Sequence, residues 1–188
     1  MMKLFMVLIG CRPKGRNTEQ HDVFFGIAEQ LSMLVPDMIS WWPEAKGQIH
    51  IDAWREVGNV DGFRVSVEKK NPFKKSLDAD PRIFFINLGG YKKEEFEEYH
   101  YKILSAGTTK SEAIQASKQT AFYKHTGFKG ATSHIDDKYG IDVDDVFEIA
   151  DILDAKFKEE FSLVLGKTKI SLEDELHIGY LKIEKIKI

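Results

Sequence analysis

Two pairs of histidine and carboxylate side chains are the residues of this sequence best suited to chemistry. The pairs are Glu19 with His21 and His50 with Asp52, and in each pair one residue lies between the two members. An imidazole near a carboxylate can act as a general acid or base, and the same groups can bind a metal ion. We predict that these four residues carry acid–base chemistry if the fold brings them together. We assign none of them as a metal ligand and name no cofactor, and a metal stays an open alternative.

The spacing of the pairs sets what the elements must do. Alternate residues of a strand point to one side, so His50, Asp52 and Trp54 should share a face of a strand over residues 48–57. The simpler interpretation is that this is the polar side of an antiparallel strand, although Trp54 could also wall a ligand pocket. Glu19 and His21 lie in a predicted helix, where residues two apart do not share a face. They would need partners from elsewhere.

A basic loop precedes that predicted helix. The apolar residues 4–9 predict a buried strand, and Asn17 with Gln20 matches a helix capping box. The apolar positions from Val23 to Leu34 then recur at helical spacing. Cations at a strand end and a helix N-terminus favour a phosphate or carboxylate, so we predict an anionic ligand there. Its candidate contacts are Arg12, Lys14, Arg16 and Asn17, and the alternative is a solvated basic turn.

Cys11 lies at the start of the same loop. Cys11 with Arg16 is similar to the loop of cysteine phosphatases, but the spacing is one residue short. Packing of a small side chain at a strand end is the simpler interpretation. Cys11 is also the only cysteine, so no disulfide can form within the chain, which favours a cytoplasmic setting.

The outline of the first segment returns later in the chain. Gly10, Glu19 and His21 recur 79 positions on as Gly89, Glu98 and His100, and His134 to Asp136 echoes His50 to Asp52. We therefore predict a mixed α/β fold of two tandem related β-α-β-β units, with mixed sheets flanked by helices and a pseudo-twofold axis. The predicted division is residues 1–70 for the first repeat, 71–80 for a linker, and 81–188 for the second repeat with the closing strands.

The remaining elements follow from local patterns. Asn59 to Gly62 predicts a hairpin turn, because Asp-Gly suits the tight turns that join antiparallel strands. Helices are expected over residues 93–123, broken at Gly107 and capped again by Thr108 or Thr109, and over 142–157. Two strands are expected at residues 161–165 and 176–183.

Composition limits the classes of partner. The formal net charge is −3 and the pI is about 6.1, so general nucleic-acid binding is disfavoured despite the lysines around residues 69–75. No apolar stretch is long enough for a transmembrane helix, and the N-terminus lacks the features of a signal peptide. We expect a cytoplasmic protein without a membrane partner, and a homo-oligomer is a further candidate assembly.

Three segments carry a resemblance: GRNTEQHD, IHIDAWREV and VDGF. They resemble a small, uncharacterised bacterial protein family whose domain of unknown function occurs in one or two copies per chain. This chain resembles the two-copy form over residues 3–67 and 82–150, and the first copy has the fuller motif. The resemblance implies that an active role lies in the first half or between the halves, and it brings no known activity or cofactor.

The leading functional hypothesis is a protein that binds a small anionic ligand at the Gly10 to His21 segment, with His21 and Asp52 available for acid–base chemistry. The hypothesis leaves open whether the protein is an enzyme. A non-enzymatic interaction or oligomeric module is the alternative, and a large exposed apolar patch would favour it. Nucleic-acid binding is the third reading.

Overall fold

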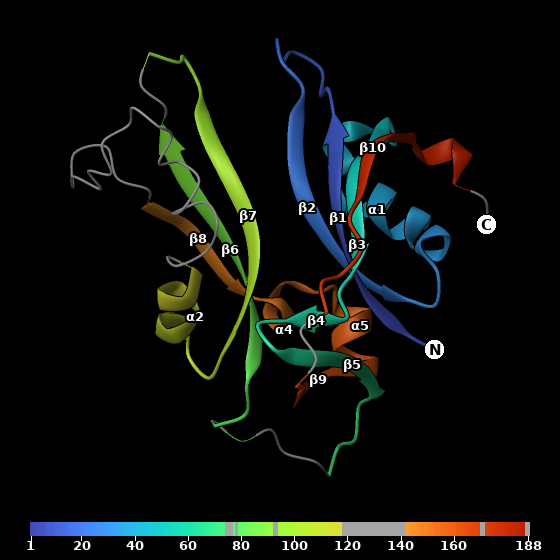
Figure 1. Ribbon diagram of the computed structural model, residues 1–188. Coiled ribbons are helices and arrows are strands. Elements are labelled where there is room, and N and C mark those ends of the chain that lie inside the picture. The colour runs from blue at the N-terminus through green and yellow to red at the C-terminus, as the bar shows by residue number, and fades with distance from the viewer. Residues whose placement is uncertain (74–76, 78, 92–93, 118–141, 170–171, 187–188) are drawn as a thin grey trace. The chain divides into compact units, whose positions relative to one another are not determined.

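The computed structural model describes residues 1–73, 77, 79–91, 94–117, 142–169 and 172–186 (Figure 1). Contacts divide the chain into two compact units: unit 1 contains residues 1–72 and 153–188, and unit 2 contains residues 73–152. The contacts divide the chain between residues 72 and 73, and the linker over residues 71–80 stays a prediction. Residues 153–188 differ from the expected division, because their strands pair with strands of unit 1.

The main sheet of unit 1 has four strands in the order β10-β3-β1-β2, and each neighbouring pair is antiparallel (Figure 1). β1 lies in the interior of this sheet, and Val7 and Ile9 are completely buried. Such a strand is apolar along its length because it is covered on both faces. The strands are β1 (Lys3–Cys11), β2 (Gln20–Ala28), β3 (Ile49–Glu56) and β10 (His177–Lys182).

Short helices cover part of this sheet and lead to a second, smaller one. The 3-10 helix η1 and helix α1 contact β2, and Met38 of α1 is fully buried. The second sheet has the order β4-β5-β9. The elements are η1 (Leu31–Leu34), α1 (Val35–Trp41), η2 (Pro43–Ala45), β4 (Asn59–Val60), β5 (Phe63–Lys69), α5 (Ala155–Glu160), β9 (Phe161–Lys167) and η3 (Ile183–Lys185).

The β4–β5 hairpin has the predicted turn. Asp61 and Gly62 both have positive φ angles, 47° and 78°. This is the backbone that Asp-Gly adopts readily and most other pairs do not. The hairpin prediction is confirmed.

Unit 2 contains a three-stranded antiparallel sheet in the order β7-β6-β8. Its core joins apolar residues of the sheet, including Phe84, Ile86 and Leu88, to Ala113 of the helix α2. The elements are β6 (Arg82–Tyr91), β7 (Glu98–Gly107), α2 (Lys110–Ser117), β8 (Asp142–Glu148) and α4 (Ile149–Ile152).

The fold is mixed α+β, as expected, but the predicted β-α-β-β order is wrong. The segment after the basic loop forms β2 instead of a helix, and residues 98–107 form β7. Every residue from Val23 to Ala28 is buried. An uninterrupted apolar run is compatible with a helix and with a buried strand. Here the segment forms a strand because it pairs with β1. The internal duplication stays a prediction.

Two further helix predictions have mixed outcomes. The helix expected over residues 142–157 is wrong at its start, because residues 142–148 pair with β6 as β8, and short helices follow only from Ile149. The helix expected before Gly107 is wrong, because residues 98–107 form β7, whereas the helix expected after it begins at Lys110 as α2. The Thr109 hydroxyl accepts a hydrogen bond from the Glu112 amide at the start of α2. His134 and Asp136 lie outside the described residues.

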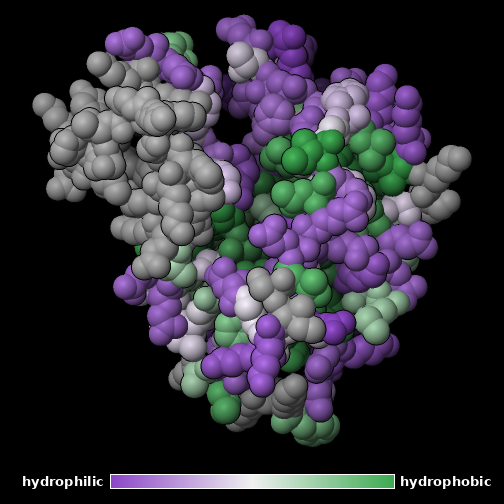
Figure 2. Space-filling view, viewed as in Figure 1, coloured by the Kyte–Doolittle hydropathy of each residue, from purple (hydrophilic) through white to green (hydrophobic). Residues whose placement is uncertain are grey.

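Much of the visible surface is hydrophilic, with a group of hydrophobic residues on the side where Figure 1 shows α1 and β10 (Figure 2). The large apolar side chains of unit 1 that are exposed include Ile178 of β10, at 81%. Among the described residues, no helix has both the length and the apolar character that crossing a membrane requires.

Candidate metal centre

The candidate centre lies where three strands of unit 1 run side by side around Gly10. Gly10 of β1 pairs with His21 of β2 on one side and with His50 of β3 on the other. Directly paired residues in a sheet point to the same face, so both imidazoles stand on the face of Gly10. Neighbouring strands are about 4.8 Å apart, so the two histidines start about 10 Å apart and meet above the glycine.

Asp52 joins them through an irregularity of β3. Ile9 pairs with Ile51 and Leu8 pairs with Ala53, which leaves Asp52 as an extra residue between two paired ones. This is a β-bulge, and bulges redirect a side chain at the edge of functional sites. The Asp52 Oδ2 atom lies 3.2 Å from His21 Nε2 and 3.3 Å from His50 Nε2.

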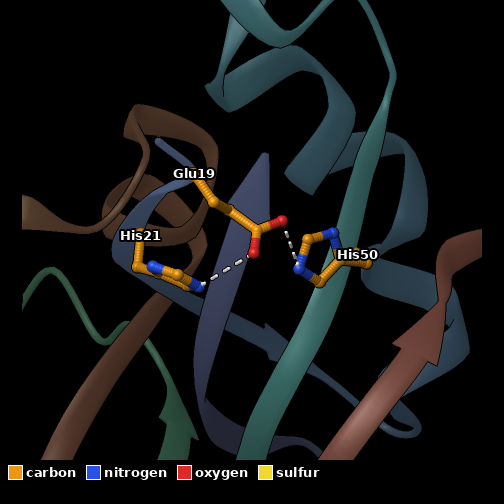
Figure 3. A group of neighbouring side chains, drawn as sticks. All are labelled: Glu19, His21 and His50. Carbon is orange, nitrogen blue, oxygen red and sulfur yellow. Dashed lines mark ion pairs between the residues drawn. The ribbon is translucent and has the colours of Figure 1, made fainter. Parts of the chain in front are cut away.

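Glu19 completes the group from the end of the loop before β2. Its two carboxylate oxygens lie 3.2 Å from His50 Nε2 and 3.8 Å from His21 Nε2 (Figure 3). Figure 3 shows both Nε2 atoms turned toward this carboxylate, one from each side. Since Glu19 leads directly into a strand, its spacing of two from His21 is the spacing that shares a face. In a helix Glu19 and His21 would point to different faces, whereas here they point to the same face.

Burial within the centre is uneven. The side chain of His50 is 9% exposed and that of Asp52 is 27% exposed, whereas those of His21 and Glu19 are 39% and 46% exposed. The centre thus has an inner wall formed by His50 and an outer side that solvent reaches.

The inner polar atoms lack the hydrogen bonds that buried groups normally make. Within the described part of the chain, His50 Nε2 and Asp52 Oδ2 are buried and have no hydrogen-bond partner, although the atoms above approach to hydrogen-bond length. A buried polar group without a partner costs roughly 1–3 kcal/mol. Lone pairs that converge on a shared point, and not on each other, are the arrangement of ligands around a cation.

The spacing of Glu19, His21 and His50 suits a small metal ion, and Asp52 lies beside both histidines. With bonds of about 2.1 Å from a tetrahedral metal to nitrogen and oxygen, neighbouring ligand atoms should lie about 3.4 Å apart. Asp52 Oδ2 lies 3.2 and 3.3 Å from the two histidine Nε2 atoms, and each Glu19 oxygen lies near one histidine, at 3.2 and 3.8 Å. Potential ligand atoms of Glu19, His21 and His50 all lie within 4.8 Å of one another. Two imidazoles and two carboxylates suit zinc and similar divalent ions.

The basic loop has a different structure from the one expected. It joins two strands, so no helix N-terminus faces it, and that part of the anion-site prediction is wrong. Arg12 donates from Nη2 to the carbonyl oxygen of Asn17 at 3.0 Å and from Nε to that of Arg16 at 3.4 Å. Arg12 therefore holds the loop that delivers Glu19. Lys14, Arg16 and Asn17 are exposed, and their role as ligand contacts stays a prediction.

Trp54 does not join the centre. Its indole stacks on the imidazole of His177 in β10, with ring centroids 3.8 Å apart and planes at 9°. Tyr180 of the same strand lies against His50, with centroids 4.5 Å apart. No sequence pattern indicates Tyr180, because only the pairing of β10 with β3 brings it near His50.

Cys11 is buried, 1% exposed, on the β1 side of the loop. Burial raises the pKa of its thiol, and the negative charges of Glu19 and Glu44 raise that pKa further. A reactive cysteine needs a lowered pKa, so the structure favours the packing interpretation over a phosphatase-like nucleophile.

The comparisons with known proteins leave activity unassigned. No curated protein matches this chain. The crystal structure of a protein Il1583 from Idiomarina loihiensis is similar over 97% of this chain and 99% of that chain, with a TM-score of 0.62 and 20% sequence identity. At this identity the likeness shows the fold alone.

The family comparison covers the centre itself. Residues 16–67 match the Domain of Unknown Function (DUF1543), and this segment includes Glu19, His21, His50 and Asp52. The expected resemblance to an uncharacterised family is confirmed for the first half, and the number of copies stays a prediction. This segment of the chain is thus similar to DUF1543.

Proposed function

We propose that unit 1 binds a divalent transition-metal ion, zinc or a chemically similar one, through Glu19, His21, His50 and Asp52. The observation that carries this proposal is the convergence of His50 Nε2 and Asp52 Oδ2, both buried and both without a hydrogen-bond partner among the described residues. A metal supplies the missing interaction for both atoms. It also offsets the charge of two carboxylates held close together.

The metal-free alternative is a His21–Asp52 acid–base pair. Their closest atoms are 3.2 Å apart, but Asp52 Oδ2 has no hydrogen-bond partner within the described residues. A histidine base that a carboxylate orients needs a directed hydrogen bond between the two. The geometry therefore supports metal binding better than a simple dyad.

A bound metal ion would also be accessible to an anionic ligand. Glu19 and His21 are partly exposed, so a bound ion would be reached from solvent on that side. The ligand set of two neutral imidazoles and two carboxylates cancels the charge of the ion, so attraction to an anion would come from Lys14 and Arg16 in the loop that precedes Glu19. We propose that a small carboxylate or phosphate approaches the metal past this loop, where Lewis-acid activation would be available to it.

Cobalt titration of the full chain tests the proposal. The protein is stripped with a chelator and titrated with Co²⁺, whose visible absorption strengthens when it enters a four-coordinate site. We expect saturation and a higher melting temperature, since a ligand at a hundred times its dissociation constant stabilises by about 2.7 kcal/mol. His21→Ala and His50→Ala should each raise the dissociation constant at least about tenfold.

His177→Ala is the matched control. His177 lies in the same unit and has the same side-chain exposure as His21, 39%, but it lies outside the centre. It should bind Co²⁺ as the unaltered chain does. Equal Co²⁺ affinity in all three histidine variants would overturn the proposal. Addition of inorganic phosphate or acetate to the loaded protein then tests the anion, which should shift the spectrum less when Lys14 and Arg16 are both alanine.

The interaction alternative has one observation in its favour. Among the described strands β10 is an edge of the main sheet, and Ile178 and Tyr180 on it are 81% and 64% exposed. Exposed apolar edges can pair with another chain. If two copies associate through β10, Ile178→Lys should convert a dimer to a monomer in analytical ultracentrifugation, and a monomeric starting protein would rule this assembly out.

A further inference from the structure

Unit 2 holds a group whose histidine–carboxylate distances are similar to those around His21 in the candidate centre. His100 Nε2 lies 3.3 Å from Asp144 Oδ2 and 3.9 Å from Glu98 Oε2. The corresponding distances from His21 Nε2 in unit 1 are 3.2 Å to Asp52 Oδ2 and 3.8 Å to Glu19 Oε2. Potential ligand atoms of Glu98, His100 and Asp144 lie within 4.8 Å of one another.

The backbone that supports this group is the same as well. Gly89 of β6 pairs with His100 of β7 on one side and with Asp142 of β8 on the other. Asp144 is the extra residue of a bulge, between Val143, which pairs with Leu88, and Asp145, which pairs with Asn87. A central glycine, a histidine beside it and a bulged aspartate thus recur in the same arrangement.

Gly89 leaves room for the Asp144 carboxylate. A Cβ atom on Gly89 would lie 2.3 Å from Asp144 Oδ2, which is too close for atoms that are not bonded. The Asp144 carboxylate therefore occupies the space that a side chain at position 89 would need. An ordinary surface ion pair does not require a neighbouring strand to lack a side chain, so this fit is independent of the acidic character of the group.

The two groups differ at one position. In unit 1 His50 pairs with the central glycine, Gly10, whereas in unit 2 Asp142 pairs with Gly89. The group in unit 2 therefore has one imidazole and two carboxylates from Glu98, His100 and Asp144. The matching side chains are about equally exposed, at 38% for His100 against 39% for His21 and 32% for Asp144 against 27% for Asp52, but the group lacks the buried imidazole of His50. Oxygen-rich sites that water can complete suit harder ions such as Mn²⁺ and Mg²⁺.

We infer that Glu98, His100 and Asp144 form a second metal site, which prefers Mn²⁺ or a similarly hard divalent ion to zinc and binds it more weakly than unit 1 binds zinc. This inference rests on the proposed metal binding of unit 1 only for the comparison of the two ligand sets. The chain would then hold two unlike metal ions, one in each unit, through two versions of the same strand arrangement.

Paramagnetic NMR of the full chain locates both sites in one experiment. Mn²⁺ broadens amide signals near the place where it binds, so substoichiometric Mn²⁺ should broaden residues around Gly89 and His100 before those around Gly10. Added Zn²⁺ should restore signals around Gly10 first. His100→Ala and the conservative Asp144→Asn should each raise the Mn²⁺ dissociation constant of unit 2 at least about tenfold. His177→Ala is again the control.

The outcomes separate the two proposals. One outcome would overturn the second site and retain the first. In that outcome Zn²⁺ binding depends on His50, but neither His100→Ala nor Asp144→Asn changes the broadening by Mn²⁺. Mn²⁺ broadening around His100 without a zinc site at His50 would overturn the proposed function and retain the second site. Asp144→Asn keeps the size of the side chain, so its spectrum distinguishes lost metal binding from a lost fold.

Discussion

Gly10 and His50 are cross-strand partners. Because Gly10 has no side chain, the His50 imidazole can occupy the space beside it. A Cβ atom built on Gly10 would lie 2.4 Å from His50 Nε2 and 2.7 Å from Asp52 Oδ2. Gly10 is not among the glycines with positive φ, so its backbone alone does not call for glycine. The requirement comes from the two side chains that meet above it.

Gly10→Ala should therefore disrupt the centre. The added methyl group must displace His50 or Asp52, and overpacking of this kind costs about 1–3 kcal/mol. We expect weaker Co²⁺ binding and a lower urea midpoint. Gly166→Ala is the control, because a Cβ there meets nothing within 4 Å in strand β9 of the same unit. Unchanged Co²⁺ affinity in Gly10→Ala would contradict this account of the glycine.

Arg12 and Arg16 should behave differently despite lying in one loop. Both side chains are exposed, but Arg12 donates hydrogen bonds to two loop carbonyls and so fixes the approach to Glu19. Arg12→Ala should weaken metal binding several-fold, and Arg16→Ala should leave it unchanged. Isothermal titration with Zn²⁺ measures both. Equal effects of the two substitutions would show that charge, and not loop structure, is what the arginines supply.

Cys11 should be slow to react in the folded protein. Since burial and nearby carboxylates raise its pKa from the ordinary value of 9.0, the thiolate forms only at higher pH than in the unfolded chain. Iodoacetamide at pH 8 should label the folded protein at least about tenfold more slowly than the protein in urea, because only the thiolate is the nucleophile. Cys11 is the only cysteine, so the label reports this site alone. Rapid labelling of the folded chain would revive the nucleophile interpretation.

The start of α2 gives a test that is independent of metal. Thr109 accepts a hydrogen bond from the Glu112 amide, and Thr109→Ala should cost about 1 kcal/mol as the loss of a helix cap. Thr109→Ser keeps the hydroxyl and should cost less. Urea unfolding followed by circular dichroism measures both variants.

Glu112 makes this end of the helix sensitive to pH. Hydrogen bonds from the Thr108 side chain and amide lower the pKa of Glu112 from its ordinary value of 4.5. A lowered pKa means that the stabilising contribution is complete above pH 4.5 and is lost as the pH falls through the folded pKa. The difference in stability between Glu112→Gln and the unaltered chain should therefore shrink below pH 4.5, and a constant difference would contradict the assignment.

Local sequence patterns were sufficient where the determinant was local. The Asp61-Gly62 turn, the strand around His50 and the cap near Thr109 depend on turn chemistry, alternation and capping, which act over a few neighbouring residues. The spacing of His50 and Asp52 indicated a shared face, and the recurrence of Glu19 and His21 as Glu98 and His100 indicated that these pairs matter together.

The sequence patterns predicted a mixed fold, which the structure has, and they indicated Glu19, His21, His50 and Asp52, whose role stays a prediction. Only the tertiary structure shows that residues 20–28 form a strand. An apolar run is compatible with a helix and with a strand, and here the hydrogen bonds to a partner strand stabilise the strand. Tertiary structure also decided which aspartate of unit 2 corresponds to Asp52. The sequence pattern pointed to Asp136, whereas pairing of β8 with β6 places Asp144 in the bulge. Register is set by contacts between distant segments, and local patterns do not encode it.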